Sequence, residues 1–494
     1  MNHGNEGTAV HDATGTARIS HNAAALPLCF DLDGSLVNTD TLLEALIRAA
    51  HDWSVLRRLP ALFASGKAGL KAGLADLVTV DPASLPYNDA ALSYLRTEKA
   101  AGRYLVLATA ANHRIADDVN RYLNGLFDEV IASDDRNNMK GAVKANALTA
   151  RFGEKGFAYA GNDRADLPVW KQAGGAVLVN VSEGVARKAA QCAPVEKIIG
   201  GSRGVLVPLL TEMRLYQWSK NVLVFVPILA SGAILDVQAW LAALLTFFSF
   251  CLVASSLYAV NDLLDIESDR SHARKRARPF ASGELSLTTG LVAIPLLLLA
   301  GFALGTCAGT LPYVAVYALV SLAYSMRLKE IQLVDVFILA GLYTIRMFAG
   351  GEATGHAISL WLLAFSSFLF LSLGIMKRVA ELKAIAARDV ASGARRGYRT
   401  DDIVVLQTFS VAAAFAASLV LALYIQSDQV TLVYSAPAML WGIIPLMLFW
   451  QCRMLLATAR GAMDDDPIVY AAKDGVTVPV ITGVAIFYLL SRWL

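Results

Sequence analysis

Residues 261–270 read NDLLDIESDR, and this stretch decides how the rest of the chain is interpreted. Asp262, Asp265 and Asp269 are spaced three and four apart, and Asn261 lies four residues before Asp265. On a helix, this spacing places the four side chains on one face. Clustered carboxylates repel one another unless a cation lies between them, and Mg²⁺ usually binds one or two carboxylates together with substrate phosphates. We therefore predict a Mg²⁺ site here; the alternative is an ordinary solvated acidic loop.

Long apolar runs lie on both sides of this stretch. The 494-residue chain is 56% hydrophobic and 17% charged, which is more apolar than a soluble domain. Most runs are near the length that crosses a bilayer, so we predict an all-α membrane bundle over residues 205–494. The nine predicted spans lie near residues 221–236, 239–260, 285–306, 310–325, 331–350, 358–376, 403–425, 430–450 and 475–492.

Basic residues are distributed unevenly among the loops between these spans. The loops at 261–284, 326–330, 377–402 and 451–474 carry Lys and Arg, whereas the four alternate loops carry none. Loops rich in Lys and Arg face the cytoplasm. We therefore predict a multi-pass protein of the cell inner (plasma) membrane, with the N-terminal domain in the cytoplasm and the C-terminus outside.

The first 200 residues differ in composition, because short apolar runs alternate there with polar, helix-like stretches. Candidate strands lie at Leu26–Asp31, Tyr104–Thr109, Glu129–Ala132, Phe157–Ala160 and Ala176–Val179. This order predicts an open, Rossmann-like α/β domain over residues 25–200, with a largely parallel sheet. Residues 41–100 contain no strong strand and are predicted to form a helical insertion. Residues 1–24 are polar and rich in Ala, Gly and Thr, so we predict a disordered tail.

Two carboxylates follow the first predicted strand. This strand runs into FDLDGSLVNTD, which places Asp31 and Asp33 at its carboxyl end. Open α/β sheets bind their ligands at this edge. Because side chains alternate along a strand with a period of two, Asp31 and Asp33 can face one metal ion or phosphate group.

Further polar residues follow later strands of the same predicted sheet. The second strand ends at Thr109, and a lysine follows in NNMKGAVKANAL, as either Lys140 or Lys144. A later strand ends in AGNDRADLPVW, which contains Asp163 and Asp166. The carboxyl ends of parallel strands meet at one edge, so these motifs indicate a single phosphate-binding site.

These four motifs, in this order, resemble the haloacid dehalogenase superfamily of phosphatases. The resemblance implies that Asp31 is a nucleophile that forms an aspartyl-phosphate and that Asp33 is the general acid/base. It also implies that Thr109 binds the phosphoryl oxygens and that Lys144, or as second choice Lys140, neutralises charge. The helical insertion would then be a cap over the site.

The resemblance covers roughly residues 25–190, with one departure in the last motif. The family usually has Asp directly after the glycine of this motif, where the present chain has Asn162. A neutral amide binds Mg²⁺ more weakly than a carboxylate does. Asp163 or Asp166 would then complete a Mg²⁺ site with the two strand-end aspartates. The alternative is an inactive, regulatory or stabilising domain.

Charged residues also lie within the predicted membrane half, where they are costly. Asp335 and Arg346 are eleven residues apart in the fifth span, or about three helical turns, so they face one side. Such residues usually face the bundle interior and mark a substrate path; the alternative is a structural ion pair. The late motif MDDDPIVYAAKD adds Asp465, Asp466 and Lys473 on the same cytoplasmic side, unless it is only a solvated loop.

Cations lie near the ends of other predicted spans. Lys220 in QWSKN opens the first span, whereas Lys377, Arg378 and Glu381 in KRVAEL close the sixth. Lys377 and Glu381 are spaced as an i,i+4 pair, which is the plain structural alternative. Together with Arg278, these residues provide the cations that a diphosphate site needs.

NDxxDxxxD, the nine predicted spans and the basic KRxRPxASG run are similar to the UbiA superfamily of intramembrane prenyltransferases, over roughly residues 205–494. Its best-known members attach polyprenyl groups to aromatic acceptors. They carry a second aspartate-rich motif after the sixth span, where this chain has KRVAEL and a basic stretch ending in RRGYRT. The motifs QWSKN, YTIRMFAGG and KRVAEL resemble the decaprenyl-phosphate phosphoribosyltransferase branch, which joins a polyprenyl phosphate to phosphoribosyl diphosphate.

The resemblance implies a Mg²⁺-dependent membrane transferase. Its clustered aspartates would bind the diphosphate of phosphoribosyl diphosphate, and a polyprenyl phosphate would attack the sugar. The fused phosphatase-like domain could then remove the 5-phosphate from the lipid-linked product. Two alternatives remain: a prenyltransferase that uses a prenyl diphosphate and an aromatic acceptor, and a transporter or scaffold with a phosphate-binding domain. The net charge of +2 gives no indication of nucleic-acid binding, and none is expected.

Overall fold

The computed structural model describes residues 10–11, 17–18, 26–134, 137–201, 204–231, 233, 235–356, 358–386, 397–428, 430, 434–463 and 466–493. Most of the predicted tail at 1–24 and Asp465 lie outside these residues. The chain divides into two compact units. Unit 1 comprises Met1–Pro208 and Asp262–Gly290, whereas unit 2 comprises Leu209–Asn261 and Leu291–Leu494.

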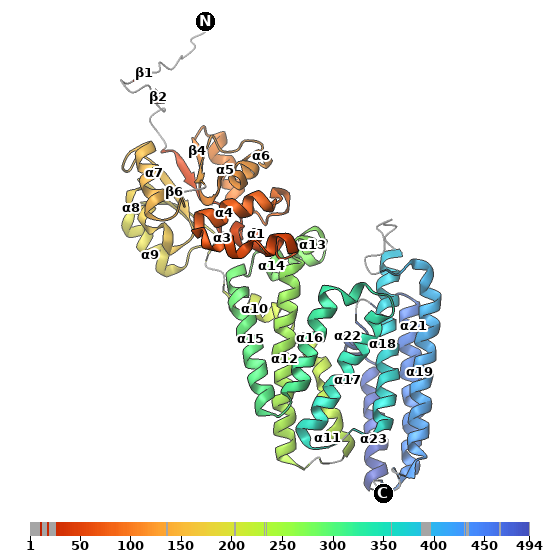
Figure 1. The fold of residues 1–494 in the computed structure, drawn as a ribbon. Coiled ribbons are helices and arrows are strands. Elements are labelled where there is room, and N and C mark those ends of the chain that lie inside the picture. Colours follow the sequence, from red (N-terminus) through yellow and green to blue (C-terminus); the bar gives the residue numbers. More distant parts are fainter. Residues whose placement is uncertain are drawn as a thin grey trace. The chain divides into compact units, whose positions relative to one another are not determined.

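A six-stranded sheet forms the centre of unit 1 (Figure 1). Its strands, in the spatial order β5-β4-β3-β6-β7-β8, are Glu129–Ser133, Leu105–Asn112, Leu28–Phe30, Ala158–Gly161, Gly175–Val179 and Val195–Ile199. Every pairing is parallel. The predicted parallel α/β fold is confirmed. The sequence missed β8 because its polar residues Glu196 and Lys197 are exposed at the sheet edge.

Helices cover both faces of this sheet. Alternate strand residues point to opposite faces, so Leu28 and Phe30 pack in one core and Cys29 in another. The second core is closed by α7 (Ala142–Phe152), α8 (Leu167–Gln172) and α9 (Glu183–Cys192). Two sheet-facing layers of helices are the usual cover of a parallel sheet.

The predicted helical insertion is present on the other face. Its elements are α1 (Thr41–Ala49), α2 (Trp53–Leu56), α3 (Leu59–Ala64), α4 (Gly66–Leu77), η1 (Pro82–Ser84) and α5 (Asp89–Ala100). The first core joins Val55, Leu70 and Leu74 of this insertion to the sheet and to α6 (His113–Tyr122). The insertion is therefore packed onto the domain through apolar side chains.

The remaining elements of unit 1 are short. β1 (Val10–His11) and β2 (Ala17–Arg18) form an antiparallel pair. The segment after residue 262 forms α13 (Ile266–Ser271), η4 (Lys275–Ala277) and α14 (Pro279–Ser282). The acidic stretch therefore lies mostly outside the long helix that precedes it. The short helix α10 (Leu206–Glu212) crosses from the first unit into the second.

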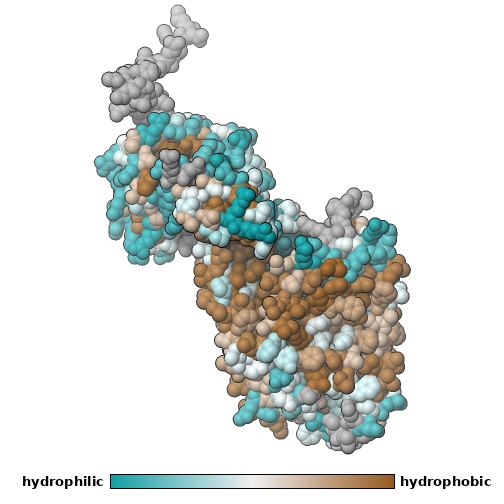
Figure 2. Space-filling view, viewed as in Figure 1, coloured by the Kyte–Doolittle hydropathy of each residue, from teal (hydrophilic) through white to brown (hydrophobic). Residues whose placement is uncertain are grey.

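Unit 2 is a bundle of helices (Figure 1). Its main elements are η3 (Leu215–Phe225), α11 (Val226–Ser231), α12 (Val237–Leu264), α15 (Leu287–Cys307), α16 (Leu311–Met326), α17 (Val334–Thr354), α18 (Leu360–Ala386), α19 (Ile403–Ile425), α21 (Ile443–Ala459), α22 (Pro467–Lys473) and α23 (Thr477–Trp493). Three short 3₁₀ turns, η5 (Leu328–Glu330), η6 (Thr400–Asp402) and η7 (Pro437–Gly442), lie between them. Figure 2 shows that hydrophobic residues cover the middle of the visible face of this bundle.

Six helices of the described residues are long and apolar enough to cross a membrane, or seven if α22 and α23, bent by 88°, count as one span. The membrane bundle is confirmed, and the predicted count of nine is approximate. The predicted first span corresponds to η3 and α11, and the fourth to α16, a helix of 16 residues. These segments are apolar but shorter than the about 20 residues that a straight span needs.

A close backbone contact between α17 and η3 fixes the centre of the bundle. A Cβ atom added to Gly350 would lie 2.0 Å from the carbonyl oxygen of Val224. A backbone atom cannot move aside as a flexible side chain can. On the same helix, a Cβ atom at Gly341 would meet nothing within 4 Å.

We predict that Gly350→Ala destabilises the bundle by about 2 kcal/mol, because overpacking a tight contact usually costs about 1–3 kcal/mol. Thermal unfolding of the detergent-solubilised protein should show a lower midpoint for Gly350→Ala than for wild type. The matched variant Gly341→Ala should leave the midpoint unchanged. Equal midpoints for the two variants would contradict the contact.

Candidate functional site

In unit 1, an aspartate and a lysine meet at the end of β3. Asp31 follows β3 directly, and its Oδ1 accepts a hydrogen bond of 2.8 Å from Nζ of Lys144. Lys144 lies on α7 and also donates to the hydroxyl of Tyr159, at 2.9 Å. Lys140 is exposed. Of the two lysines left open by the sequence, the structure therefore brings Lys144 to Asp31.

Asp33 lies at the start of the helical insertion. Its Oδ1 accepts a hydrogen bond of 2.9 Å from the backbone N–H of Thr41, the first residue of α1. Burial raises the pKa of Asp31 to about 6 and the pKa of Asp33 to about 7. Lys144 opposes the first shift and the Thr41 N–H opposes the second. Two neighbouring carboxyls with raised pKa values suit a proton-transfer or metal-binding role.

Thr109 lies in β4, and its side chain is buried. Its hydroxyl oxygen accepts a hydrogen bond of 3.0 Å from the backbone N–H of Ala111. Since β4 pairs with β3, the structure places Thr109 on the strand next to the one that carries Asp31.

The last motif brings the amide of Asn162 to the site, whereas its second carboxylate, Asp166, binds groups within the motif itself. A Cβ atom on Gly34 would lie 2.0 Å from Nδ2 of Asn162, so this amide abuts the loop that carries the two strand-end aspartates. Asp166 accepts hydrogen bonds from the hydroxyl of Tyr159 and from the backbone N–H groups of Asn162 and Asp163. Asp163 accepts from the backbone N–H of Arg164. Asp166 therefore holds the turn together, and Asn162 reaches the first motif.

The sequence did not indicate that a lysine of the insertion belongs to this site. Nζ of Lys71, on α4, donates to Oδ1 of Asn138 at 2.9 Å and to the carbonyl oxygen of Ala110, next to Thr109. Burial lowers the pKa of Lys71, whereas the nearby Asp33 acts in the other direction. The lysine occurs in the apolar repeat GKAGLKAGL, which gives no signal of a site. Lys71 brings a cation from the insertion toward the aspartates.

The acidic stretch that runs from the end of α12 into α13 forms a second cluster in unit 1. Nη1 of Arg278 donates to Oδ1 of Asp262 at 2.9 Å and to Oδ2 of Asp269 at 2.6 Å. Both carboxylates are nearly fully buried, and Lys275 Nζ lies 3.9 Å from Asp269. Burial raises the pKa of Asp269, although Arg278 acts in the other direction. Asp265 precedes α13 and is partly exposed.

These contacts test whether the clusters fit Mg²⁺. One guanidinium nitrogen bridges Asp262 and Asp269, so the two carboxylates converge within reach of a single cation. Oδ1 of Asp269 is buried and accepts no hydrogen bond. Among the described residues, no three His, Cys, Asp or Glu side chains already form a metal-binding group. The chemistry fits a Mg²⁺ ion that is completed by substrate oxygens, as such ions usually are.

Unit 2 contains a cluster of cations around one carboxylate. Asp466 caps α22, and its Oδ2 lies 2.5 Å from Nζ of Lys220 and 3.6 Å from Nζ of Lys377. The two lysines come from η3 and α18, far apart in the sequence. Two lysines against one carboxylate leave net positive charge, which suits an anionic ligand. The sequence placed Asp466 on the cytoplasmic side with the other charged motifs, with a solvated loop as the alternative, and gave no partner for it.

Asp335 and Arg346 both point into the bundle, but they have different partners. Asp335 is fully buried and accepts from Nε of Arg378 at 2.8 Å and from the hydroxyl of Tyr398 at 2.6 Å. Arg378 also pairs with Glu381. The interior placement that the sequence predicted is observed for Asp335, and the cation that it holds is on α18.

Arg346 lies deeper along α17. Its Nε donates to Oδ1 of Asn221 at 2.6 Å, and its Nη2 donates to the hydroxyl of Tyr317 at 3.2 Å. Its guanidinium also lies 4.6 Å from the ring centre of Tyr317, a cation–π distance. Asn221 follows Lys220 directly, so the QWSKN motif contributes to both the lysine cluster and the arginine pocket. Asn261 is partly exposed at the end of α12.

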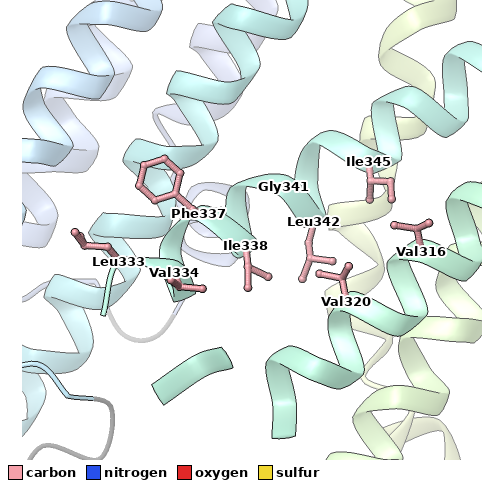
Figure 3. A pocket seen from close by; sticks show the side chains of 9 residues that line it. All are labelled: Val316, Val320, Leu333, Val334, Phe337, Ile338, Gly341, Leu342 and Ile345. Atoms are coloured by element: carbon pink, nitrogen blue, oxygen red, sulfur yellow. The ribbon is translucent and has the colours of Figure 1, made fainter. Parts of the chain in front are cut away.

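An apolar groove of about 530 Å³ lies on α16 and α17 (Figure 3). Figure 3 shows Val316 and Val320 of one helix facing Leu342 and Ile345 of the other. The lining residues are Val316, Val320, Leu333, Val334, Phe337, Ile338, Gly341, Leu342 and Ile345. With no polar side chain among them, the groove suits a hydrocarbon chain.

Comparison with known proteins gives a family for the membrane half. Residues 222–466 match the UbiA prenyltransferase family. The uncharacterized protein y4nM of Sinorhizobium fredii is 38% identical over 461 residues, which cover 91% of this chain and 88% of that protein. The nodulation protein NoeC of Azorhizobium caulinodans is 34% identical over 57% of this chain and 92% of its own.

Other matches cover one part of the chain each. The decaprenyl-phosphate phosphoribosyltransferase of Mycolicibacterium smegmatis is 35% identical over 193 residues, 37% of this chain and 60% of that enzyme. The structure of a UbiA homolog from Archaeoglobus fulgidus bound to GPP and Mg²⁺ is 14% identical, with a TM-score of 0.43, over 57% of this chain and 97% of its own. The family assignment therefore rests on the sequence matches.

We predict that Asp33→Asn stabilises the metal-free protein above pH 7. The folded-state pKa of Asp33, about 7, lies above that of an unfolded aspartate, about 3.9. Stability linked to this carboxyl is therefore present at low pH and lost as pH rises through 7. In EDTA at pH 8, Asp33→Asn should unfold at a higher temperature than wild type, and the difference should shrink as the pH falls below 7 and vanish only below about pH 3.9.

Addition of Mg²⁺ provides the control for this prediction. At pH 8, Mg²⁺ should raise the unfolding midpoint of wild type more than that of Asp33→Asn, because a bound cation offsets the cost of the buried charge. The same response to Mg²⁺ in both proteins would show that Asp33 contributes nothing to metal binding.

Proposed function

The chain belongs to the UbiA prenyltransferase family, and from this membership we propose that it transfers phosphoribose from phosphoribosyl diphosphate to a polyprenyl phosphate. The observation that carries the proposal is the pair Lys220 and Lys377 at Asp466. Well-known family members that prenylate aromatic acceptors carry a second acidic motif after the sixth span. This chain has cations there, which suits a reaction with phosphate groups on both substrates. The name of the M. smegmatis relative supports this choice.

Each group of residues has a separate role in the proposed reaction. Asp262, Asp265 and Asp269 would hold Mg²⁺, which when bound would neutralise the diphosphate and make it a better leaving group. Arg278 then moves from the carboxylates to a substrate phosphate. Lys220 and Lys377 would bind the remaining phosphate oxygens.

The bond changes balance without a proton donor. An oxygen of the polyprenyl phosphate forms a bond to the anomeric carbon of the sugar. The bond from that carbon to the diphosphate breaks, and its electron pair leaves with the diphosphate. In the bundle interior Arg378 is paired with Asp335, whereas Arg346 is hydrogen-bonded to the neutral side chain of Asn221.

The lipid substrate accounts for the membrane location of the reaction. A polyprenyl chain needs an apolar surface, and the groove on α16 and α17 provides one (Figure 3). The distribution of Lys and Arg among the loops supports an N-terminal unit on the cytoplasmic side of the inner membrane, where the water-soluble phosphoribosyl diphosphate is accessible.

We predict that membranes containing this protein incorporate label from phosphoribosyl diphosphate into a lipid. Asp262→Asn should lower the rate by about 100-fold or more, because loss of a metal ligand removes several kcal/mol of charge stabilisation. Asp236→Asn, which changes an acidic residue at the other end of α12, should leave the rate unchanged. Lipid products would be measured by mass spectrometry.

The same assay separates the alternatives. Label incorporated from a prenyl diphosphate into an aromatic acceptor, and none from phosphoribosyl diphosphate, would establish the conventional prenyltransferase reaction. Absence of any lipid product with Asp262→Ala and wild type alike would favour a transporter or a membrane scaffold.

For unit 1 we propose a phosphatase that removes the 5-phosphate from the lipid-linked sugar. An oxygen of Asp31 attacks the phosphorus, and Asp33, protonated near neutral pH, donates its proton to the leaving sugar oxygen. Water then attacks the aspartyl-phosphate, Asp33 accepts its proton, and inorganic phosphate leaves. Lys144 and Lys71 balance the phosphoryl charge. Mg²⁺ at Asp31, with Asn162 facing the same loop, would polarise the phosphoryl group.

We predict that Asp31→Asn protein accumulates lipid-linked phosphoribose that still carries its 5-phosphate, whereas wild type accumulates the dephosphorylated lipid. The physical reason is the loss of the nucleophile with little change in shape. Asp117→Asn, at an exposed position on α6, is the control and should behave as wild type. Identical lipid profiles for Asp31→Asn and wild type would rule out this role for unit 1.

A further inference from the structure

A buried ion pair joins the insertion of unit 1 to the acidic stretch after α12. Glu44, on α1, is fully buried and accepts hydrogen bonds from Nη1 and Nη2 of Arg270, at 3.1 and 2.6 Å. The hydroxyl of Thr39 also donates to Glu44, at 2.6 Å. Nε of Arg270 donates to the carbonyl oxygen of Ala281. All three guanidinium nitrogens of Arg270 are thus used.

Two more contacts surround this pair. Arg48, one turn further along α1, forms an ion pair with Glu267. Gly283 has a φ of 74°, and a Cβ atom there would lie 2.3 Å from the carbonyl oxygen of Asn38. We call these six residues the docking patch: Asn38, Glu44, Arg48, Glu267, Arg270 and Gly283. Backbone and charge contacts together fix how α1 lies on the segment that follows α12.

Each side of the docking patch leads directly to a set of aspartates. On one side, α1 begins at Thr41, whose N–H binds Asp33, and the N–H of Gly34 donates to the carbonyl oxygen of Thr39. On the other side, Arg270 directly follows Asp269, which shares Arg278 with Asp262. A change at either set of aspartates therefore acts on the same short elements.

The ion pair between Glu44 and Arg270 has few alternative arrangements. Removal of one partner leaves the other buried and uncompensated, which is strongly unfavourable. A bidentate arginine–carboxylate contact also has a narrow geometry. The docking patch is therefore either formed or broken, and a discrete element of this kind can transmit a change between two sites.

We propose that Arg270 and Glu44 are positioning residues that link phosphate and metal binding at Asp31 and Asp33 to the geometry of the segment carrying Asp262 and Asp269. When phosphate and metal are bound at Asp31 and Asp33, Thr41 and α1 are held in place, and the docking patch then holds α13. The two proposed reactions are thereby coordinated. The proposal rests on the proposed function only in assigning the second set of aspartates to the transferase.

Trypsin cleavage within residues 270–278 tests the link without any assay of transfer. Arg274 and Arg276 are exposed there and are good sites for trypsin. In the full-length protein, Mg²⁺ with inorganic phosphate should slow cleavage of this segment in wild type. Glu44→Gln should speed basal cleavage by about tenfold, since opening becomes easier when a buried charge loses its partner. It should also abolish the response to phosphate.

Three controls make the outcome specific. Asp31→Asn should remove the response to phosphate. Glu129→Gln, which breaks the exposed pair with Arg151 on another part of unit 1, should change neither quantity. The double variant Glu44→Gln/Arg270→Gln, which removes both buried charges, should unfold at a temperature closer to that of wild type than Glu44→Gln does. It should still lack the phosphate response.

The proposal is overturned if Glu44→Gln cleaves at the wild-type rate, or if the phosphate response persists in Glu44→Gln or in Asp31→Asn. A kinetic readout follows in the transferase assay, where Glu44→Gln should raise the KM for Mg²⁺ more than it lowers kcat. If phosphoribosyl diphosphate is not a substrate but the trypsin response is present, the proposed function fails and the link stands.

Discussion

A carboxylate buried away from water needs a cation or several hydrogen-bond donors beside it, and ion pairs supply the cation at many places in this protein. Asp31 has Lys144, Asp335 has Arg378, and Asp466 has Lys220. Asp262 and Asp269 share Arg278, and Glu44 has Arg270. Because a lone buried charge costs several kcal/mol, each of these pairs constrains which elements can pack together. The partners usually lie on different elements, so the pairs also define the tertiary arrangement within each unit.

These pairs are of two kinds, and the difference separates structure from chemistry. Arg378 is held by Asp335 and Glu381, and Asp335 is also held by Tyr398, so the network has little capacity for a ligand. The cluster at Asp466 differs, because two lysines share one carboxylate and a net positive charge remains. At Arg278 one guanidinium nitrogen is shared by two carboxylates, and the second cation, Lys275, lies only at 3.9 Å from Asp269. Loosely neutralised charges of this kind can be taken over by a charged ligand, so these clusters are the better candidates for substrate and metal.

The sequence predicted the fold classes because periodicity is a local signal, and its strand-end motifs pointed to residues that the fold brings close together, such as Asp31 and Lys144. The motif alone left Lys140 and Lys144 open, the resemblance ranked Lys144 first, and the position of α7 brings Lys144 to Asp31. The sequence missed Lys71 and the role of Asp466, because their contacts join residues distant in sequence. Spacing placed Asp335 and Arg346 on one side of a helix, but the choice of Arg378 and Asn221 as partners depends on how three other segments pack.

The change in amino-acid composition and the boundary between the two compact units fall at different places in the chain. Apolar content changes near residue 205, whereas the compact units divide so that residues 262–290 belong with the N-terminal unit. The segment between the apolar helices α12 and α15 buries Ile266, Phe280 and Leu285, and it packs where its charges find partners. For this segment the partners are Glu44 and Arg48 of α1. The acidic stretch of the membrane half is therefore supported by contacts with α1 of the N-terminal unit.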